Sequence, residues 1–163
     1  MKRAAFIWIT LLAFVMRSAP AEMAPLMTKK INICLNTGLQ TDSILHSPLW
    51  TWEIKGSIRV HRSLQISPEF MFSTEFSLNF RNCYINPGIM VNYVAKKFFI
   101  GAGATMLIKV AGWTRNKFSP ALKINAGLIF NRGMFTVYAV PWTDYRGIES
   151  NSTIIGASIG FLY

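Results

Sequence analysis

Residues 50–61 alternate strictly between apolar and polar side chains. Consecutive side chains of a β-strand point to opposite faces, so this alternation predicts a strand with one apolar and one polar face. The two faces would carry Trp50, Trp52, Ile54, Gly56, Ile58 and Val60, and Thr51, Glu53, Lys55, Ser57, Arg59 and His61, respectively. Beyond residue 29 no stretch shows the sustained apolar repeat of an amphipathic helix. We therefore expect an all-β fold.

The same two-residue period recurs along the chain and predicts eight strands. They cover residues 31–40, 50–61, 64–76, 83–94, 98–109, 120–131, 134–145 and 153–163, and the alternation is less regular in the first and seventh. The connections at 61–63, 95–97 and 132–133 are tight turns, whereas those at 41–49, 77–82, 110–119 and 146–152 are longer. Short turns at one end and long loops at the other predict an eight-stranded antiparallel up-and-down transmembrane β-barrel.

Alternation alone fits two barrels of opposite polarity. A soluble, lipocalin-like periplasmic carrier of an apolar ligand turns its apolar face inward, whereas a membrane barrel turns it toward lipid. The rhythm of the connections favours the membrane barrel, as do aromatic residues near strand ends, because aromatic girdles mark membrane interfaces. These residues are Trp50, Trp52, Tyr93, Phe98, Phe130 and Tyr163. The soluble carrier stays as an alternative.

The polar face of a membrane barrel would line a narrow lumen. Its charged side chains are of both signs: Glu53, Lys55, Arg59, Glu69, Glu75, Lys109 and Lys123. Opposite charges that are buried together neutralise one another. We therefore expect these residues to form a structural network of lumenal ion pairs rather than a catalytic site.

The start of the chain has the three-part layout of a secretory signal peptide. A basic start precedes an apolar run at residues 4–16, and small residues follow. The run is shorter than the roughly 20 residues that a membrane-spanning helix needs. We expect cleavage between Ala21 and Glu22, a linker at 22–29 and a barrel domain at 30–163, in a protein exported through the periplasm to the cell outer membrane.

The end of the chain carries a family resemblance. Residues 154–163 alternate and close on an aromatic residue, which looks like the terminal signal by which barrel-assembly machinery recognises outer-membrane barrels. Phe161 and Tyr163 would be the residues recognised. Residues 30–163 as a whole resemble the small eight-stranded outer-membrane β-barrel proteins, the OmpA-barrel, OmpX and PorT-like group. This resemblance implies a fold and a compartment, and it implies hardly anything about activity.

One triplet invites a catalytic interpretation. His61-Arg62-Ser63 is similar to the His-x-Ser pair of outer-membrane lipid A deacylases, in which a histidine activates a serine nucleophile. The triplet falls in a tight turn that the topology assigns to the periplasmic rim, so we interpret it as a turn. The expected function is non-enzymatic, an envelope-structural or surface-loop binding role, with a barrel-type lipid A-modifying enzyme as the alternative. Trp113, Arg115 and Lys117 in the third long loop are the candidates for binding an extracellular ligand.

The chain has few residues of the types that commonly bind metals or cofactors. The two His and two Cys residues are scattered without metal-ligand spacing, and no phosphate-binding glycine loop is present. We expect no metal and no cofactor. Cys34 and Cys83 fall on different strands at different depths, which disfavours a disulfide because its Cα atoms must lie roughly 4.4–6.8 Å apart.

The formal net charge of +10 raises the question of an anionic partner. The basic residues would lie on two rims: Lys29, Lys30, Arg62, Lys96, Lys97 and Arg132 by the short turns, and Arg81, Arg115, Lys117 and Arg146 by the long loops. Two basic rims around an apolar belt suit anionic lipid headgroups. A nucleic-acid binder would gather its charge on one face with stacking aromatics. We therefore expect outer-membrane lipids as partners, and no nucleic acid.

Overall fold

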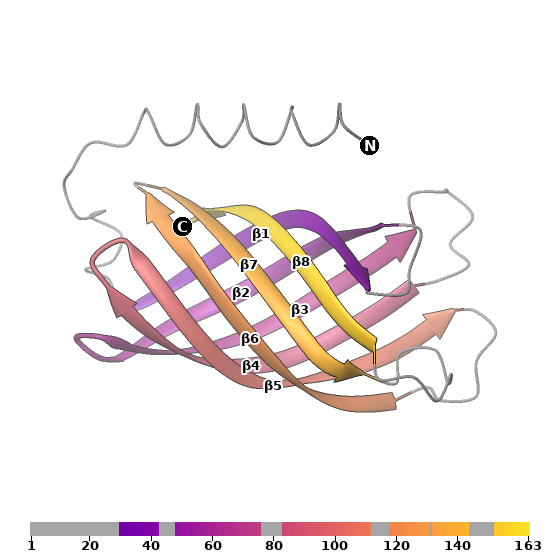
Figure 1. Cartoon of the computed structure of the whole chain (residues 1–163). Helices are drawn as coiled ribbons and strands as arrows, with labels where there is room; N and C mark the ends of the chain where they lie inside the picture. The colour runs from indigo at the N-terminus through magenta and orange to yellow at the C-terminus, as the bar shows by residue number, and fades with distance from the viewer. Residues whose placement is uncertain (1–29, 43–47, 76–82, 112–117, 131, 144–151) are drawn as a thin grey trace.

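The computed structural model describes residues 30–42, 48–75, 83–111, 118–130, 132–143 and 152–163. They form one closed barrel of antiparallel strands paired in sequence order, as predicted (Figure 1). The strands are β1 (Ile31–Asp42), β2 (Leu49–His61), β3 (Leu64–Glu75), β4 (Cys83–Ala95), β5 (Phe98–Ala111), β6 (Phe118–Phe130), β7 (Gly133–Thr143) and β8 (Ser152–Leu162). Within these ranges no helix is long and apolar enough to cross a membrane.

The strands begin and end close to the residues that the alternation predicts. Differences of two residues occur at β1, which extends to Asp42, and at β5 and β6, which extend to Ala111 and back to Phe118. β5 and β6 stay paired there, with Ile108 opposite Phe118, because ladder hydrogen bonds continue where the side-chain pattern has already become irregular. Residues 76, 131, 144 and 145 of the predicted strands lie outside the described residues.

The connections separate by length, as predicted. The turns at 62–63, 96–97 and 132 lie at one end of the barrel, together with the beginning of β1 and the end of β8 (Figure 1). We call this the short-turn end. Lys96 has a φ of 56°, the left-handed conformation that tight hairpin turns require. The four longer connections join the strands at the opposite end, the long-loop end, and lie largely outside the described residues.

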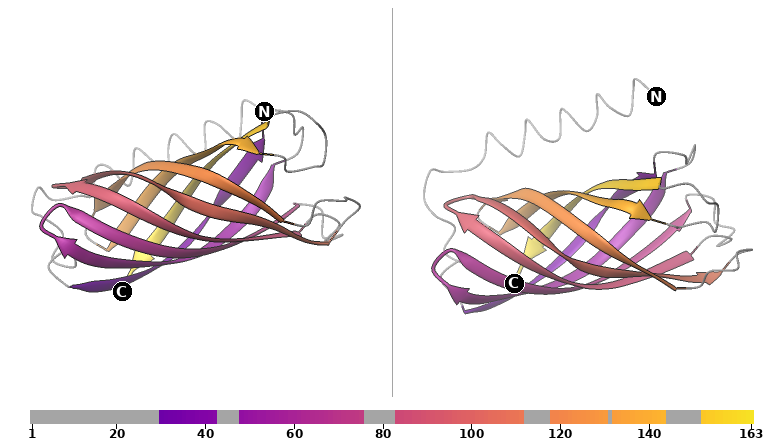
Figure 2. Two further views of the ribbon diagram at one scale, coloured as in Figure 1. Left: turned by 90° about the horizontal axis from the view of Figure 1, so that it is seen from below. Right: turned by 60° about the horizontal axis from the view of Figure 1, so that its bottom comes forward.

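The strands are strongly staggered. A path of directly paired residues that starts at Ile31 and passes once round the barrel returns to β1 at Thr41. It runs through Ile58, Ile66, Val91, Ala102, Ile124, Ala139 and Ile155. A stagger of this kind requires strands that tilt relative to the barrel axis, and Figure 2 shows the tilt.

Apolar side chains face outward and polar ones inward. Phe98 and Ile100 are 65% and 63% exposed on the outer face, whereas Thr51 and Ser67 are fully buried inside. This polarity is that of a membrane barrel and the reverse of a lipocalin-like cup. Aromatic side chains gather near strand ends, and the Trp52 ring stacks on Phe72 with 5.8 Å between centroids.

Apolar side chains also close both ends of the interior, which the sequence pattern did not predict. The short-turn cluster consists of Cys34, Val94, Phe99, Ile129, Met134 and Leu162. The long-loop cluster consists of Leu49, Met71, Tyr84, Leu107, Tyr138, Val140 and Ile154. Cys34 thus lies toward one end of the barrel, whereas Cys83 begins β4 at the other, and the two do not form a disulfide.

Inward-facing glycines let the walls approach closely. A Cβ atom at Gly103 would overlap the carbonyl oxygen of Ile89 and lie 2.7 Å from Cα of Met90. Its neighbour Ala104 faces outward and is exposed. The two positions therefore differ in the space available to a side chain, although they are adjacent on one strand.

The predicted consequence is that Gly103→Val destabilises the barrel and Ala104→Val does not. Overpacking costs about 1–3 kcal/mol or more, whereas valine suits an exposed strand position. Urea unfolding in lipid vesicles, read by the gel shift between folded and unfolded forms, measures both variants. Equal midpoints for the two would contradict the inward orientation of Gly103.

Candidate functional site in the barrel lumen

A buried ion cluster occupies the middle of the lumen. Nζ of Lys123 on β6 lies 2.5 Å from Oε1 of Glu69 on β3 and 3.4 Å from Oε1 of Glu53 on β2. Lys123 is 2% exposed, and Glu53 and Glu69 are 6% exposed. We call these three residues the central ion cluster. An ammonium between two carboxylates satisfies charges that would be very costly to bury alone.

The strand order explains why this contact matters. Glu53 and Glu69 face inward from the neighbouring strands β2 and β3, where Glu69 is the direct partner of Lys55. Lys123 is on β6, which pairs only with β5 and β7. Its side chain therefore crosses the lumen and joins walls of the barrel that share no backbone hydrogen bonds.

Neutral side chains surround the central ion cluster. Asn36 on β1 donates a 2.5 Å hydrogen bond from Nδ2 to Oε2 of Glu53, and the Cys34 thiol donates to Oδ1 of Asn36 at 2.9 Å. Nζ of Lys123 also lies 4.6 Å from the ring centroid of Tyr138. The Tyr138 hydroxyl donates to Oε1 of Gln40 at 3.0 Å. These contacts bring β1 and β7 into the same polar layer.

Lys55 is a second buried cation on the short-turn side of this layer. It is 2% exposed and makes no ion pair with another described residue; its Nζ lies 5.3 Å from the ring centroid of Phe99. Together with Lys123 it balances the formal charges of Glu53 and Glu69. Cation–π contact and the nearby carboxylates are therefore what stabilises this ammonium.

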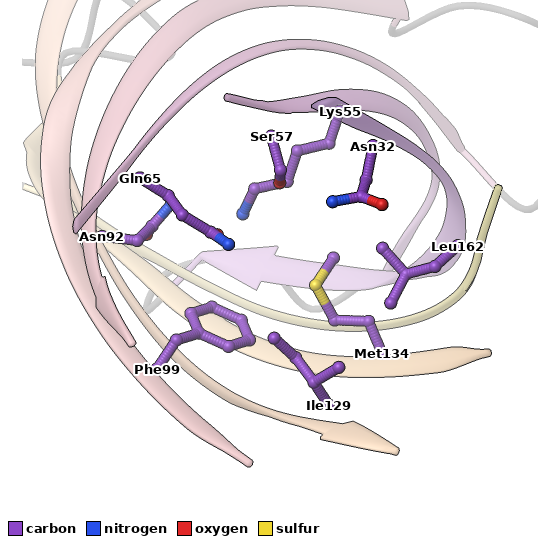
Figure 3. A pocket seen from close by; sticks show the side chains of 9 residues that line it. All are labelled: Asn32, Lys55, Ser57, Gln65, Asn92, Phe99, Ile129, Met134 and Leu162. Atoms are coloured by element: carbon purple, nitrogen blue, oxygen red, sulfur yellow. The ribbon is translucent and has the colours of Figure 1, made fainter. Parts of the chain in front are cut away.

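A small cavity lies beside Lys55 in the short-turn half of the lumen (Figure 3). Its volume is about 20 Å³, and it is lined by Asn32, Lys55, Ser57, Gln65, Asn92, Phe99, Ile129, Met134 and Leu162. A space of this size accepts about one water molecule. It is far below the roughly 300–1,000 Å³ of pockets that bind organic ligands.

The seven charged residues predicted for the lumen lie at different depths. The structure brings together Glu53, Glu69 and Lys123, with Lys55 beside them. Arg59 is half-buried next to an irregularity in the β2–β3 ladder and makes no ion pair with a described residue. Glu75 and Lys109 are half-buried toward the long-loop end, where Nζ of Lys109 lies 5.6 Å from the Tyr84 ring centroid. These differences in depth follow from strand geometry, because successive residues on one face of a strand are about 6.6 Å apart along the strand.

The other predicted site residues are distributed as follows. His61, Arg62 and Ser63 connect β2 and β3 at the short-turn end, where the Ser63 carbonyl accepts a hydrogen bond from the Val94 amide at 2.8 Å. The positions outside the described residues are Trp113, Arg115, Lys117, Ala21 and Glu22. Among the described residues no three His, Cys, Asp or Glu side chains gather as metal ligands would.

Among the contributors to this site that the sequence pattern missed are Asn36 and Tyr138. Both lie on the strands where alternation is least regular, β1 and β7. Asn36 could have been found from its face of β1, which it shares with the polar residues Asn32 and Gln40. Tyr138 carries no such signal, because an aromatic residue in a β-strand fits a lipid-facing position equally well.

We expect Lys123→Met to lower the free energy of unfolding by about 3–5 kcal/mol, because it leaves two carboxylates buried without their cation. Arg59→Gln, at a half-buried residue outside the cluster, should change it by about 0.5 kcal/mol or less. Urea unfolding in vesicles measures both. Glu69→Gln combined with Lys123→Met should cost less than the sum of the single changes, and strict additivity would contradict a direct Lys123–Glu69 contact.

Comparison with known proteins gives a fold and no family. No protein-family model matches the chain, and no curated protein matches it. The crystal structure of Neisserial surface protein A (NspA) is similar, with a TM-score of 0.59 and 9% identity over 81% of this chain and 94% of that one. A structure from the de novo design of transmembrane β-barrels has a TM-score of 0.55 and 10% identity, over 81% of this chain and 95% of that one. The chain thus has the fold of transmembrane β-barrels.

Proposed function

We propose that this chain is a non-enzymatic outer-membrane β-barrel protein with an envelope-structural or surface-loop binding role. The observation that carries the proposal is a polar lumen filled by its own side chains inside an apolar outer wall. The wall suits a lipid bilayer, and the filled lumen suits an anchor rather than a pore.

The outer wall supports insertion into a membrane. Large apolar side chains are exposed on all eight strands, for example Ile33, Phe70, Val91 and Phe161. Soluble monomers rarely expose a contiguous apolar patch larger than a few hundred Å². Closure of the sheet also pairs the backbone groups of β1 with those of β8, as hydrocarbon surroundings require.

The packing of the interior favours the function of a membrane anchor over that of a diffusion channel. The short-turn cluster and the long-loop cluster lie on either side of the central ion cluster. Barrels of eight strands have an interior just wide enough for side chains to fill. An interaction with a soluble partner would then fall to the rims and the long loops. The proposed candidates Trp113, Arg115 and Lys117 belong to the connection between β5 and β6, outside the described residues.

No specific observation favours the lipid A-modifying enzyme. The His61–Ser63 turn lies at the short-turn end, which faces the periplasm in the orientation proposed here. Lipid A deacylation belongs on the outer side of the membrane. The triplet also completes the β2–β3 hairpin, which accounts for its position without chemistry.

The full-length protein should therefore float with outer membranes, migrate differently on gels with and without boiling, and give no stepwise conductance in planar bilayers. The physical reason is the side-chain packing across the lumen. Met71→Gly with Leu107→Gly, which empties part of the long-loop cluster, serves as the variant expected to admit some current. Stable single channels in the unmodified protein, or its recovery in osmotic-shock fluid, would contradict the proposal.

Recognition by barrel-assembly machinery, proposed for Phe161 and Tyr163, has a matched control. Phe161 and Phe118 are both 65% exposed, and they lie near opposite ends of the barrel. We expect Phe161→Ala with Tyr163→Ala to lower the outer-membrane level at least five-fold, with folding into pure lipid vesicles unchanged. Phe118→Ala should leave the level unchanged; an equal loss in that variant would contradict specific recognition.

A further inference from the structure

The outer wall of β5 to β8 contains an apolar groove of about 580 Å³. Its outward-facing small residues are Ala102, Ala126 and Ala139. Larger branched side chains, Ile100, Ile124, Val137 and Ile155, line it as well. The volume lies within the range of small-molecule sites, roughly 300–1,000 Å³.

The register explains why the groove is continuous. Ala126 pairs with Ile100 on one side and Val137 on the other, while Ala102 and Ala139 both pair with Ile124. Each alanine is therefore opposite a branched side chain and diagonal to the next alanine. The three alanine positions lie next to one another across three strands, because neighbouring strands are about 4.8 Å apart. They therefore form one continuous groove rather than separate depressions.

Basic side chains lie at the short-turn end of the same wall. Lys96 is in the turn between β4 and β5, Arg132 is in the turn between β6 and β7, and both are exposed. The acidic residues that the structure describes are elsewhere: Asp42 and Glu75 end their strands at the long-loop end, and Glu53 and Glu69 are in the lumen. Within the described part of the chain, no carboxylate side chain pairs with Lys96 or Arg132.

The groove and the turns lie within the depth of one membrane leaflet. From Ala126 to the end of β6 at Phe130 the chain extends about 13 Å along a tilted strand, so the two levels differ in depth by less than half of a hydrocarbon core of roughly 30 Å. Between them lies a row of directly paired, outward-facing residues, Phe98, Leu128 and Phe135. Aromatic rings are enriched at the level of the membrane interface. Groove, rings and cations thus follow the order of acyl chain, ester region and phosphate in a phospholipid.

From this arrangement we propose a binding site for one anionic phospholipid of the periplasmic leaflet, with an acyl chain in the groove and the phosphate at Lys96 and Arg132. The site rests on the proposed function, since it needs the barrel in a membrane with its short turns toward the periplasm. The guanidinium of Arg132 can contact two phosphate oxygens, and the ammonium of Lys96 adds a point charge.

A second copy of the chain is a less suitable occupant of the groove. Two copies in one bilayer share an orientation, so a two-fold dimer through this wall would bring the same turns of both copies together. Lys96 and Arg132 would then face their own equivalents, and like charges repel. An anionic headgroup has the complementary charge.

Native mass spectrometry of the full-length protein in mild detergent tests the site. Dioleoylphosphatidylglycerol is the probe, and dioleoylphosphatidylcholine, with the same chains and a zwitterionic headgroup, is its control. We expect one phosphatidylglycerol to be retained at a tenfold lower concentration than one phosphatidylcholine. Lys96→Asn with Arg132→Gln should abolish that difference, whereas Lys30→Asn with Arg62→Gln, which removes equal charge elsewhere on the short-turn end, should preserve it.

A second pair of variants tests the groove. Ala126→Leu should weaken phosphatidylglycerol binding at least five-fold, and Ala104→Leu, exposed on the same wall outside the groove lining, should not. Ala139→Leu replaces Ala126→Leu if the latter does not fold. Equal effects of Ala126→Leu and Ala104→Leu, lipid binding without a one-lipid plateau, or a dimer in place of the lipid adduct would each overturn the site. Gel heat-modifiability separates these results from failure of the proposed function, because a variant that keeps the shift is still a folded barrel.

Discussion

Closure of the sheet is the constraint on which the rest of this molecule depends. β8 pairs with β1 from Leu162 opposite Cys34 to Ile154 opposite Asp42, so neither strand is left as an edge. In hydrocarbon each unpaired backbone group costs several kcal/mol, and only closed barrels and helices avoid that cost. Once the sheet is closed, the two-residue period of each strand assigns every side chain to lipid or to lumen. The apolar outer wall and the polar interior follow from this one condition.

Closure with so few strands also makes the interior narrow, and the residues of the lumen fit this narrow space. Glycine at Gly103 lets backbone and side chains of neighbouring strands meet, and Lys123 is long enough to reach across to Glu69. Because that ion pair joins β6 to β3, it couples walls that the ladder connects only through intervening strands. The apolar clusters at both ends keep it away from bulk water, which strengthens the attraction and raises the cost of removing either partner.

The two-residue period of the sequence predicts much of this fold, and the features that it does not predict have physical causes. Residues 50–61 of β2 alternate without exception, so the strand, its faces and the inward position of Glu53 follow from the period alone. The period gives a face and not a depth, which is why Arg59 was grouped with Glu53 although it lies near the short-turn end. The period also gives no answer where both faces of a strand are apolar, as on β7. There the inward position of Tyr138, like the apolar clusters that close the lumen, depends on packing between strands that are distant in sequence. The groove of β5 to β8 cannot be predicted from the period either, because it depends on the register that sets Ala126 beside Ile100 and Val137.

The basic surplus of the chain has a structural explanation in the separation of lumen from rim. In the middle of the lumen the buried Lys55 and Lys123 are matched by Glu53 and Glu69, so these four side chains hold no formal excess. Among the described residues, most of the other basic side chains lie where charge needs no burial, at the short-turn end. They are Lys30, Arg62, Lys96, Lys97 and Arg132. In the proposed orientation each such residue near an anionic membrane surface contributes about 1 kcal/mol of attraction. The short turns offer few other groups that could hold this end of the barrel at the membrane interface. These basic side chains can therefore fix the depth of the barrel in the bilayer.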